Sequence, residues 1–289
     1  MCLTRIPSPH DFRARAEAFL LEREAEHNLP LGLTTALMFN PDLYGTQPYF
    51  AVVEDAEASQ ASGIIAAALM TPPYRLVLSL VEDWEALTLI ARDVHEFRPD
   101  TPGVTGPVPV SLQFAEIWRA LTGRSFRRSM AERIYKLEKV RPTSGISGHM
   151  RRAVEADRAL LIEWMTAFQQ EAFGEPDPAA VERMAHNMLV MPPELRGTYL
   201  WEDPYRVSLV SYGGPTPNSM RLGPVYTPPE SRRNGYASAC VAGVSQYLLD
   251  SGRKFCTLFT DLANPTSNHI YQAIGYEPVC DVDEYKFIE

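Results

Sequence analysis

The sequence predicts an α/β protein made of two similar halves, each a mostly antiparallel twisted sheet flanked by helices. Helical and strand-like hydrophobic patterns alternate along the chain. Both halves show the same order of elements: two helices, paired strands, a corner, a helix and a strand. The 289 residues are enough for two domains, and 45% hydrophobic with 22% charged residues is ordinary for a globular protein.

The first half begins with helical patterns and continues into strands. Apolar residues at helical spacing predict helices over residues 10–28, 33–39, 84–97 and 111–121. Runs of β-type residues predict strands over residues 49–54, 63–71, 75–81 and within 127–140. The polar residues 55–62 are expected to connect the first two strands as a hairpin. Residues 104–107, Val-Thr-Gly-Pro, are expected to form a turn or a bulge.

A segment rich in Pro, Ser and Gly, residues 142–148, is the best candidate for a linker between domains. We therefore expect one domain over residues 1–142 and a second over residues 143–289. After the linker, strands are predicted over residues 150–154, 197–201, 205–212, 220–227, 255–260 and 279–288. Helices are predicted after Asp157, after Gly235, and over residues 179–189 and 267–274. The repeated order favours an internal duplication over two unrelated halves.

Composition and charge narrow the classes of partner. The net charge is −9 and the pI is about 5.3, which disfavours nucleic acid because phosphate neutralisation needs a basic face. A cationic amine would suit the negative field, although acidity also serves plain solubility. The four cysteines form no C-x-x-C pair, the N-terminus shows no signal-peptide pattern, and no apolar run approaches about 20 residues. We expect a cytoplasmic protein with no membrane partner.

Residues 225–237 carry the clearest functional signal. A short strand enters a proline turn, then a basic corner that contains glycine, and then an amphipathic helix. The first backbone N–H groups of such a helix lack partners, and the positive end of its dipole favours an anion. Gly235 allows a close backbone approach, small Ala237 leaves the helix start open, and Arg232 and Arg233 add positive charge. The sequence therefore predicts a pyrophosphate site here.

Two ordered motifs give a resemblance to a known family. The corner has the sequence Arg232-Arg233-Asn234-Gly235-Tyr236-Ala237, and downstream lie Asn264-Pro265-Thr266-Ser267-Asn268-His269-Ile270-Tyr271 and then Gly275-Tyr276. The first resembles the signature of the GCN5-related N-acetyltransferase superfamily: Arg or Gln, two residues, Gly, one residue, then Gly or Ala. Together the motifs are similar to the FR47-like group. The resemblance covers about residues 150–289. It implies acetyltransferase-like domains in tandem, the first of them degenerate.

The resemblance implies that acetyl-coenzyme A is the co-substrate. Backbone amides of the corner would hold its pyrophosphate, and Arg232 or Arg233 would screen the charge. The amides concerned belong to Arg233, Asn234, Gly235, Tyr236 and Ala237. The strand residues Val225, Tyr226 and Thr227 would pair with the pantetheine arm like an added strand. The Val225 N–H would polarise the thioester carbonyl as a one-donor oxyanion site.

Three further residues have expected roles. Tyr271 would stand near the sulfur and protonate the leaving thiolate, and Asn264 would hold the loop or contact the pantetheine arm. Pro224 cannot donate to a ladder, which predicts a bulge that splays this strand from its neighbour. Ordinary alternatives exist, with Tyr271 as a core tyrosine, Asn264 as a turn residue and the two arginines as solvated turn residues.

The general base is left unassigned. A substrate ammonium must lose a proton before it attacks, and a carboxylate that acts through water is a common solution. The strand over residues 220–227 contains no Asp or Glu, so the glutamate frequent in the family is missing. The candidates, each of which could equally be a solvated surface carboxylate, are Glu202, Asp203, Glu230, Asp283 and Glu284.

The first half departs from the family at its own corner. Residues 103–107 lie roughly in the corresponding position, but no basic residue precedes them in register. Pro107 and Pro109 also remove backbone donors that a pyrophosphate needs. We expect no second coenzyme site. This half is expected to be a degenerate domain that helps to shape the acceptor pocket.

The sequence therefore predicts an N-acyltransferase that moves an acetyl group to an amine by direct attack, with a small molecule or a peptide as acceptor. A coenzyme A-binding sensor or scaffold without catalysis is the main alternative, supported by the missing strand carboxylate. A third is an aminoacyl-tRNA-dependent peptidyl transferase, which the acidic balance disfavours. The six histidines never sit four residues apart or beside a cysteine, so no metal site is expected. Serine-hydrolase and P-loop motifs are absent from the sequence.

Overall fold

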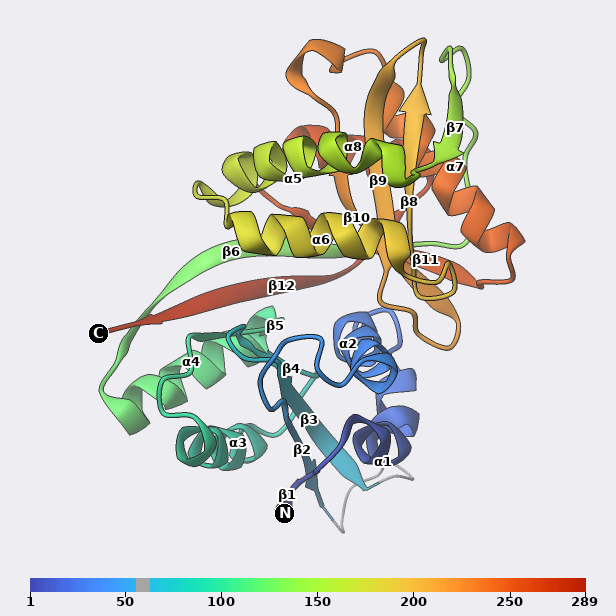
Figure 1. Cartoon of the computed structure of the whole chain (residues 1–289). Coiled ribbons are helices and arrows are strands. Elements are labelled where there is room, and N and C mark those ends of the chain that lie inside the picture. The colour runs from blue at the N-terminus through green and yellow to red at the C-terminus, as the bar shows by residue number, and fades with distance from the viewer. Residues whose placement is uncertain (56–62) are drawn as a thin grey trace. The chain divides into compact units, whose positions relative to one another are not determined.

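The structure, a computed structural model, describes residues 1–55 and 63–289. Its contacts divide the chain into two compact units (Figure 1). Unit 1 holds residues 1–135, 260–264 and 278–289, and unit 2 holds residues 136–259 and 265–277. The mixed α/β class is confirmed in both units. The predicted division between residues 142 and 143 stays a prediction, and residues 56–62 of the predicted hairpin connection lie outside the described residues.

Unit 1 is built on a mixed sheet whose strands follow the order β1-β2-β3-β4-β5-β12-β6. Neighbours from β1 to β4 are antiparallel, β4 and β5 are parallel, and β12 is antiparallel to β5. The strand bounds are β1 (Cys2–Arg5), β2 (Tyr49–Glu54), β3 (Ile64–Met70), β4 (Leu76–Leu78), β5 (Gly103–Pro107), β6 (Ser125–Leu137) and β12 (Glu277–Ile288).

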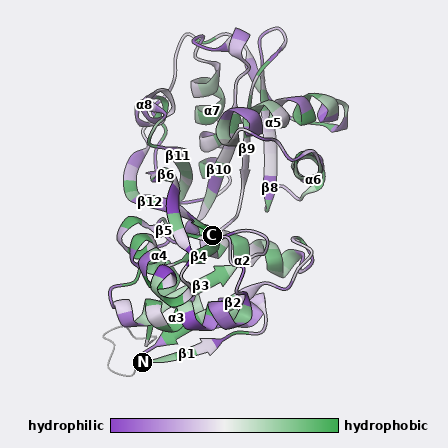
Figure 2. Ribbon diagram, turned by 90° about the vertical axis from the view of Figure 1, so that its left-hand side faces the viewer, coloured by the Kyte–Doolittle hydropathy of each residue, from purple (hydrophilic) through white to green (hydrophobic). Residues whose placement is uncertain are grey.

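Four helices cover the two faces of this sheet among the described residues. They are α1 (Pro9–Leu21), α2 (Asn28–Phe39), α3 (Trp84–Phe97) and α4 (Val108–Thr122). One core cluster joins the sheet to α3 and α4 around Trp118, and another joins it to α1 and α2 around Phe12. Strand β3 carries side chains to both clusters, which explains its continuous hydrophobic run (Figure 2).

Three predictions for unit 1 are wrong. The helix expected over residues 10–28 ends at Leu21, and residues 22–27 form turns. Residues 104–107 are not a turn: they belong to β5, which lies between β4 and β12 and is buried along its whole length. Its glycines resemble those of a turn in the sequence, but they are needed because β5 packs closely against its neighbours. A Cβ on Gly103 would lie 2.1 Å from the Tyr285 carbonyl oxygen. Helix α2 begins at Asn28 and not at residue 33, since Pro30 is tolerated in a first turn.

Unit 2 repeats this plan. Its strands follow the order β11-β10-β9-β8-β7, with β10 and β11 parallel and the others antiparallel. The strand bounds are β7 (His149–Arg152), β8 (Arg196–Glu202), β9 (Arg206–Gly213), β10 (Ser219–Tyr226) and β11 (Phe255–Asp261). The helix bounds are η1 (Glu155–Asp157), α5 (Arg158–Phe173), α6 (Pro178–Val190), η2 (Pro229–Ser231), α7 (Tyr236–Asp250) and α8 (Pro265–Ile274).

Helices lie on opposite faces of the unit 2 sheet because side chains alternate along its strands. Leu200 and Leu209 pack with α5 and α6, which lie side by side in Figure 1. The preceding residue of β8, Tyr199, instead faces α7, where its ring lies 5.3 Å from that of Tyr247. Helix α7 therefore packs on the face opposite α5 and α6.

The last strand of the chain completes the sheet of unit 1. Strand β12 pairs with β5 from Val282↔Pro107 to Lys286↔Gly103. Its inward residues Tyr285 and Phe287 join the core, and the Phe287 ring stacks 5.1 Å from that of Trp118. The predicted strand at residues 279–288 is confirmed, but its place in unit 1 was not foreseen.

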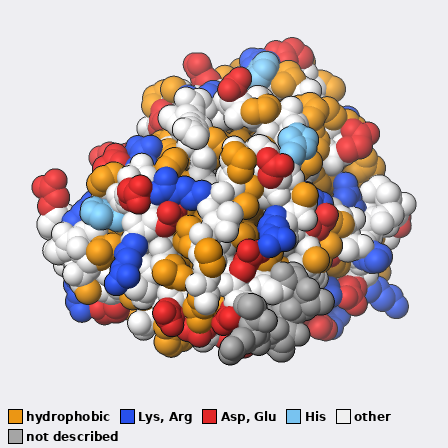
Figure 3. Space-filling model, turned by 90° about the horizontal axis from the view of Figure 1, so that it is seen from below, with side chains coloured by type: hydrophobic (Ala, Val, Ile, Leu, Met, Phe, Trp, Pro, Cys, Tyr) orange, Lys and Arg blue, Asp and Glu red, His pale blue; other side chains and the backbone are white. Residues whose placement is uncertain are grey.

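The surface carries both signs of charge. On the face drawn in Figure 3, Lys and Arg side chains are interspersed with Asp and Glu, and apolar side chains are scattered between them. Within residues 1–55 and 63–289, every helix is too short or too polar to cross a membrane.

Candidate functional site

Strand β10 is irregular at the point where the sequence predicts a bulge. It pairs with β11 only from Ser219↔Phe255 to Leu222↔Leu258. Its register with β9 shifts between Leu222 and Val225, and the Gly223–Pro224 peptide bond within the shift is cis. The predicted bulge is confirmed. After Leu222 no pairing with β11 continues in the described chain, so one edge of residues 225–227 is left for another strand-like partner.

The corner after β10 ends at a helix without a side-chain cap. Gly235 is the N-cap of α7 with φ 81°, and Arg233 also has a positive φ of 65°. The first N–H of the helix to be bonded in its backbone ladder is that of Ala239, which donates to the Gly235 oxygen at 3.0 Å. The N–H groups of the preceding turn are therefore directed out of the helix end, where an anion can accept them.

Only glycine fits at the N-cap. The left-handed φ of Gly235 is strained for any residue with a Cβ. A Cβ there would also lie 2.4 Å from Cδ1 of Ile146. The backbone conformation and the lack of space for a side chain therefore both require glycine at this position.

The two arginines of the corner differ in their partners. Both Oε atoms of Glu171 on α5 accept from Nη2 of Arg232 at 2.7 Å, and the Arg232 Nε–H donates to the Thr227 oxygen at 2.9 Å. Arg233 is exposed and has no ion pair within the described part of the chain. Arg232 thus links α5 to the corner, and the exposed Arg233 side chain forms no ion pair with the described residues. Their predicted roles stay predictions.

The three predicted strand residues are held in fixed register. Val225 pairs with Val210 on β9, and the Thr227 hydroxyl shares a 2.9 Å hydrogen bond with the Ser208 hydroxyl. Tyr226 is 6% exposed, and its ring lies 6.0 Å from that of Trp164. Its hydroxyl donates to Glu171 at 3.4 Å, and burial is the main cause that raises its pKa. The Tyr226 side chain is therefore a core group, and only its backbone is available to a ligand.

Tyr271 lies on α8 and is 7% exposed. Burial raises its pKa to about 12, so the phenol keeps its proton at neutral pH. Its ring packs edge-on against Tyr276 at 6.0 Å, while its hydroxyl has no hydrogen-bond partner among the residues described. Asn264, exposed, lies between β11 and α8, and its backbone N–H donates to the Asp261 oxygen at 3.0 Å. The roles predicted for both residues are neither confirmed nor contradicted.

Most of the candidate base carboxylates are already engaged. Glu202 accepts from Arg151 at 2.8 Å, and Asp203 accepts from the hydroxyls of Ser147 and Tyr236. The remaining engaged pair lies in unit 1, where Asp283 faces Arg128 at 3.4 Å and Glu284 faces Arg75 at 3.0 Å. Glu230 is exposed. None of these contacts marks a general base.

Sequence reasoning missed Glu171. It lies 61 residues before Arg232, and no local pattern connects the two. To find Glu171 from the sequence, one would need a signal that links it to Arg232 across the intervening residues, and a single sequence carries no such signal.

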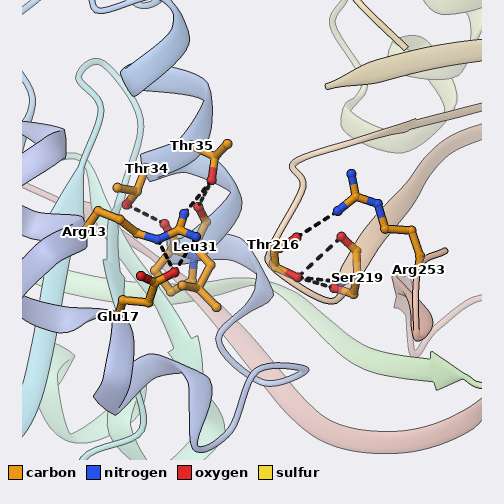
Figure 4. Close-up of polar contacts among 9 residues, drawn as sticks. Arg13, Glu17, Leu31, Thr34, Thr35, Thr216, Ser219 and Arg253 are labelled. Carbon is orange, nitrogen blue, oxygen red and sulfur yellow. Dashed lines mark hydrogen bonds and ion pairs between the residues drawn. The ribbon is translucent and has the colours of Figure 1, made fainter. Parts of the chain in front are cut away.

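Two hollows lie away from the corner. One, of about 350 Å³ in unit 2, is lined by Tyr212, Tyr247 and Arg253 among others, and one of about 500 Å³ in unit 1 is lined by His10 and Asp42 among others. Figure 4 shows that Arg253 donates to the Thr216 oxygen at 3.0 Å and so fixes the turn before β10. Neither hollow includes a residue of the corner.

A second group in Figure 4 belongs to unit 1. Arg13 donates to Glu17 at 2.6 Å and to the Thr35 hydroxyl at 2.9 Å, which ties α1 to α2. These contacts hold helices together and present no open ligand group. Among the described residues, no three His, Cys, Asp or Glu side chains converge as metal ligands.

Comparison with known proteins bears on this corner directly. Residues 216–286 match the family model of FR47-like proteins, a range that runs from the turn before β10 through α7 and α8 into β12. The predicted resemblance to the FR47-like group of the GCN5-related N-acetyltransferase superfamily is confirmed. None of the curated proteins matches the chain.

Solved structures share the fold of the whole chain. A Drosophila protein is 12% identical with a TM-score of 0.69, and the match covers 99% of this chain and 98% of that one. A GCN5-related N-acetyltransferase from Sphaerobacter thermophilus is 18% identical with a TM-score of 0.63, covering 99% and 96%. A tandem GNAT protein from the clavulanic acid biosynthesis pathway is 16% identical with a TM-score of 0.58, covering 100% and 98%. The tandem fold predicted from the sequence is confirmed.

Proposed function

We propose that this protein is an N-acyltransferase that moves an acetyl group from acetyl-coenzyme A to an amine. The observation that carries the proposal is the combination of a splayed strand with an uncapped helix start directly after it. Strand β10 leaves β11 after Leu222, and α7 begins with no side-chain cap at Gly235. An extended arm that ends in a pyrophosphate fits both features at once.

The residues present suit two parts of coenzyme A, the pantetheine arm and the pyrophosphate. The open edge of residues 225–227 offers backbone donors and acceptors to the two amides of the pantetheine arm. The first-turn N–H groups of α7 and the positive end of its dipole suit the pyrophosphate, and exposed Arg233 adds a cation. The resemblance to FR47-like proteins over residues 216–286 supports this assignment.

The chemical step needs no covalent intermediate on the protein. The amine nitrogen attacks the thioester carbonyl, a C–N bond forms and the C–S bond breaks. The Val225 N–H stabilises the developing oxyanion, and Tyr271 gives its proton to the thiolate. The proton lost by the amine returns through water to Tyr271, so the products are an amide and free coenzyme A. Burial raises the pKa of Tyr271 to about 12, so the phenol carries its proton at neutral pH.

The acceptor belongs to the class of primary amines, either a small molecule or a peptide. The net charge of −9 favours a cationic acceptor over nucleic acid. We place this activity in the cytoplasm, with no membrane partner, on the composition alone.

Thioester consumption tests the proposal. Purified protein is mixed with acetyl-coenzyme A and a panel of amines that covers amino acids, polyamines, aminoglycosides and peptide N-termini, and release of the free thiol is followed. We expect release that depends on at least one amine and that Gly235→Glu abolishes. Absence of acetyl-coenzyme A binding by calorimetry would refute the proposal at its first step.

A coenzyme A-binding sensor without catalysis is the second candidate. Strand β10 contains no carboxylate, and Glu171, whose carboxylate reaches the Tyr226 hydroxyl, is already bound by Arg232. Binding of acetyl-coenzyme A without thiol release from any amine would favour the sensor.

A further inference from the structure

The carboxylate of Asp203 joins two segments beside the coenzyme corner. Asp203 follows β8 and is half-buried. Its Oδ2 accepts from the Tyr236 hydroxyl at 2.8 Å and also from the Ser147 hydroxyl. Tyr236 is the first residue of α7, and Ser147 belongs to the segment that links the two halves of the sequence. One acceptor therefore fixes both a helix start and a linker.

The linker side of this contact is tightly seated. The Trp201 Nε1–H donates to the Ser147 oxygen at 2.9 Å. Gly148 has φ +100°, and a Cβ there would lie 2.4 Å from the Glu202 oxygen and 2.6 Å from Trp201 Nε1. Only glycine allows the chain to lie so close to the end of β8.

The same segment touches the N-cap of α7. Ile146 is half-buried, and its Cδ1 lies 2.4 Å from the position that a Cβ on Gly235 would take. Residues 146–148 therefore meet the start of α7 twice, by an apolar contact at Gly235 and through Asp203 at Tyr236. These are the residues whose backbone N–H groups the proposed function assigns to the pyrophosphate.

We propose that Asp203 is a positioning residue of the coenzyme corner, and that coenzyme binding is coupled through it to residues 146–148. The inference rests on the proposed function. Backbone N–H groups bind an anion well only when they already point toward it in the free protein, because ordering them on binding lowers the affinity. Coupling between two sites is reciprocal. If the contacts of residues 146–148 raise the affinity for coenzyme A by some factor, bound coenzyme A stabilises those contacts by the same factor.

The charge state of Asp203 suits this task. The two hydroxyls that donate to it, first Ser147 and then Tyr236, lower its pKa below the ordinary value. The group is therefore an ionised acceptor at neutral pH, and hydrogen bonds to a charged acceptor are stronger than those between neutral groups. An amide in its place keeps the shape and loses the charge.

The test measures coenzyme A binding by calorimetry in matched variants. Asp203→Asn should weaken binding roughly five- to tenfold, and Tyr236→Phe should weaken it by no more than that, because Asp203 also accepts from Ser147. The double variant should be no weaker than Asp203→Asn alone, since the Tyr236 contact runs through the same carboxylate. Glu202→Gln is the control, because its carboxylate pairs with Arg151 and touches neither Ser147 nor Tyr236. Its affinity for coenzyme A should match that of the unaltered protein.

Limited proteolysis supplies an independent readout. Coenzyme A should protect residues 142–148 from cleavage in the unaltered protein and should protect them less in Asp203→Asn. Unaltered affinity and equal protection in Asp203→Asn would overturn the inference while leaving the proposed function standing. Failure of the unaltered protein to bind coenzyme A would overturn both. Melting curves show whether a variant is folded, and Tyr236→Phe tests the same contact if Asp203→Asn is not.

Discussion

Two corners occupy the same place in the element order of their units, and they differ in whether a side chain caps the helix that follows. In unit 2, β10 leads to α7 through Arg233 and Gly235, and no side chain caps the helix. In unit 1, β4 leads to α3 through residues 79–83, and the Asp83 carboxylate accepts the Glu85 N–H at 2.9 Å. In unit 1 the start of α3 is therefore already capped by the negatively charged side chain of Asp83. A side-chain cap and a bound anion are alternatives at one position.

The strands that lead into these two corners also differ, because one is regular and the other is bulged. Strand β4 pairs with β3 and β5 in continuous register, antiparallel to β3 and parallel to β5, with Leu76 opposite Val104. Strand β10 is bulged and leaves β11 after Leu222. The sequence analysis expected the counterpart corner at residues 103–107, which is wrong because those residues form β5. The expectation of a single coenzyme site stays a prediction.

The largest expected effect breaks the open corner. Gly235→Glu should lower coenzyme A affinity by at least roughly a hundredfold, because a Cβ meets Ile146, the φ of 81° is strained, and a carboxylate repels phosphate. Asp83→Ala at the other corner should leave coenzyme binding unchanged and cost about 1 kcal/mol of stability. Calorimetry and urea unfolding measure the two quantities, and equal losses of affinity in both variants would contradict the contrast.

The next effect compares how the first long helix of each unit begins. Asp157, buried before α5, is bound by Arg151 at 2.7 and 2.8 Å, whereas Asp11 in the first turn of α1 is exposed. Asp157→Asn should cost about 3 kcal/mol, because the buried carboxylate of Asp157 loses its charge-assisted hydrogen bonds from Arg151, which keeps Glu202 as a partner. Asp11→Asn should cost much less. Unfolding curves that shift equally for the two variants would remove the distinction.

The same ion pair predicts a dependence on pH. Hydrogen bonds from Arg151 are the main cause that lowers the pKa of Asp157 below its ordinary 3.8. Its contribution to stability is therefore present above pH 3.8 and lost as the pH falls through the lower folded value. Below that range the Asp157→Asn variant and the unaltered protein should converge in stability, which urea titrations at several acid pH values can follow.

A smaller effect separates binding from turnover. Tyr271→Phe should lower kcat roughly a hundredfold while leaving coenzyme affinity nearly intact, because a general acid acts only in the transition state. The corresponding helix of unit 1, α4, contains no tyrosine, and its buried rings Phe114 and Trp118 serve only the core. Since burial raises the pKa of Tyr271 to about 12, no alkaline loss of activity from this group is expected near pH 10. Full turnover in the variant would exclude Tyr271.

The smallest effect distinguishes the two arginines. Arg233→Ala should weaken coenzyme A binding roughly three- to tenfold, and the loss should shrink as salt is raised, because an exposed cation is screened. Arg232→Ala should act mainly on stability, by less than about 1 kcal/mol, since its ion pair with Glu171 is about half exposed. If Arg232→Ala weakened coenzyme A binding and Arg233→Ala changed only stability, the roles of the two arginines would be exchanged.

What could be predicted from the sequence follows from what is local. The bulge at Pro224, the strand–corner–helix order and the need for glycine at residue 235 each leave a mark within a few residues. The bond from Arg232 to Glu171 and the bonds to Asp203 do not, because they join positions far apart in the chain. Strand β5 was mistaken for a turn because close packing and turns select the same small residues. Local chemistry predicted the corner, and only the fold shows what supports it.

The C-terminal strand has a consequence for synthesis. During translation, β5 emerges long before residues 278–289, which are its partner in the sheet of unit 1. Until residues 278–289 have emerged from the ribosome, that edge of β5 has no strand to cover it, and an open edge is prone to pair with other chains. The first unit to be made is therefore the last that can be completed, and chaperones that shield nascent sheets would act on it throughout that interval.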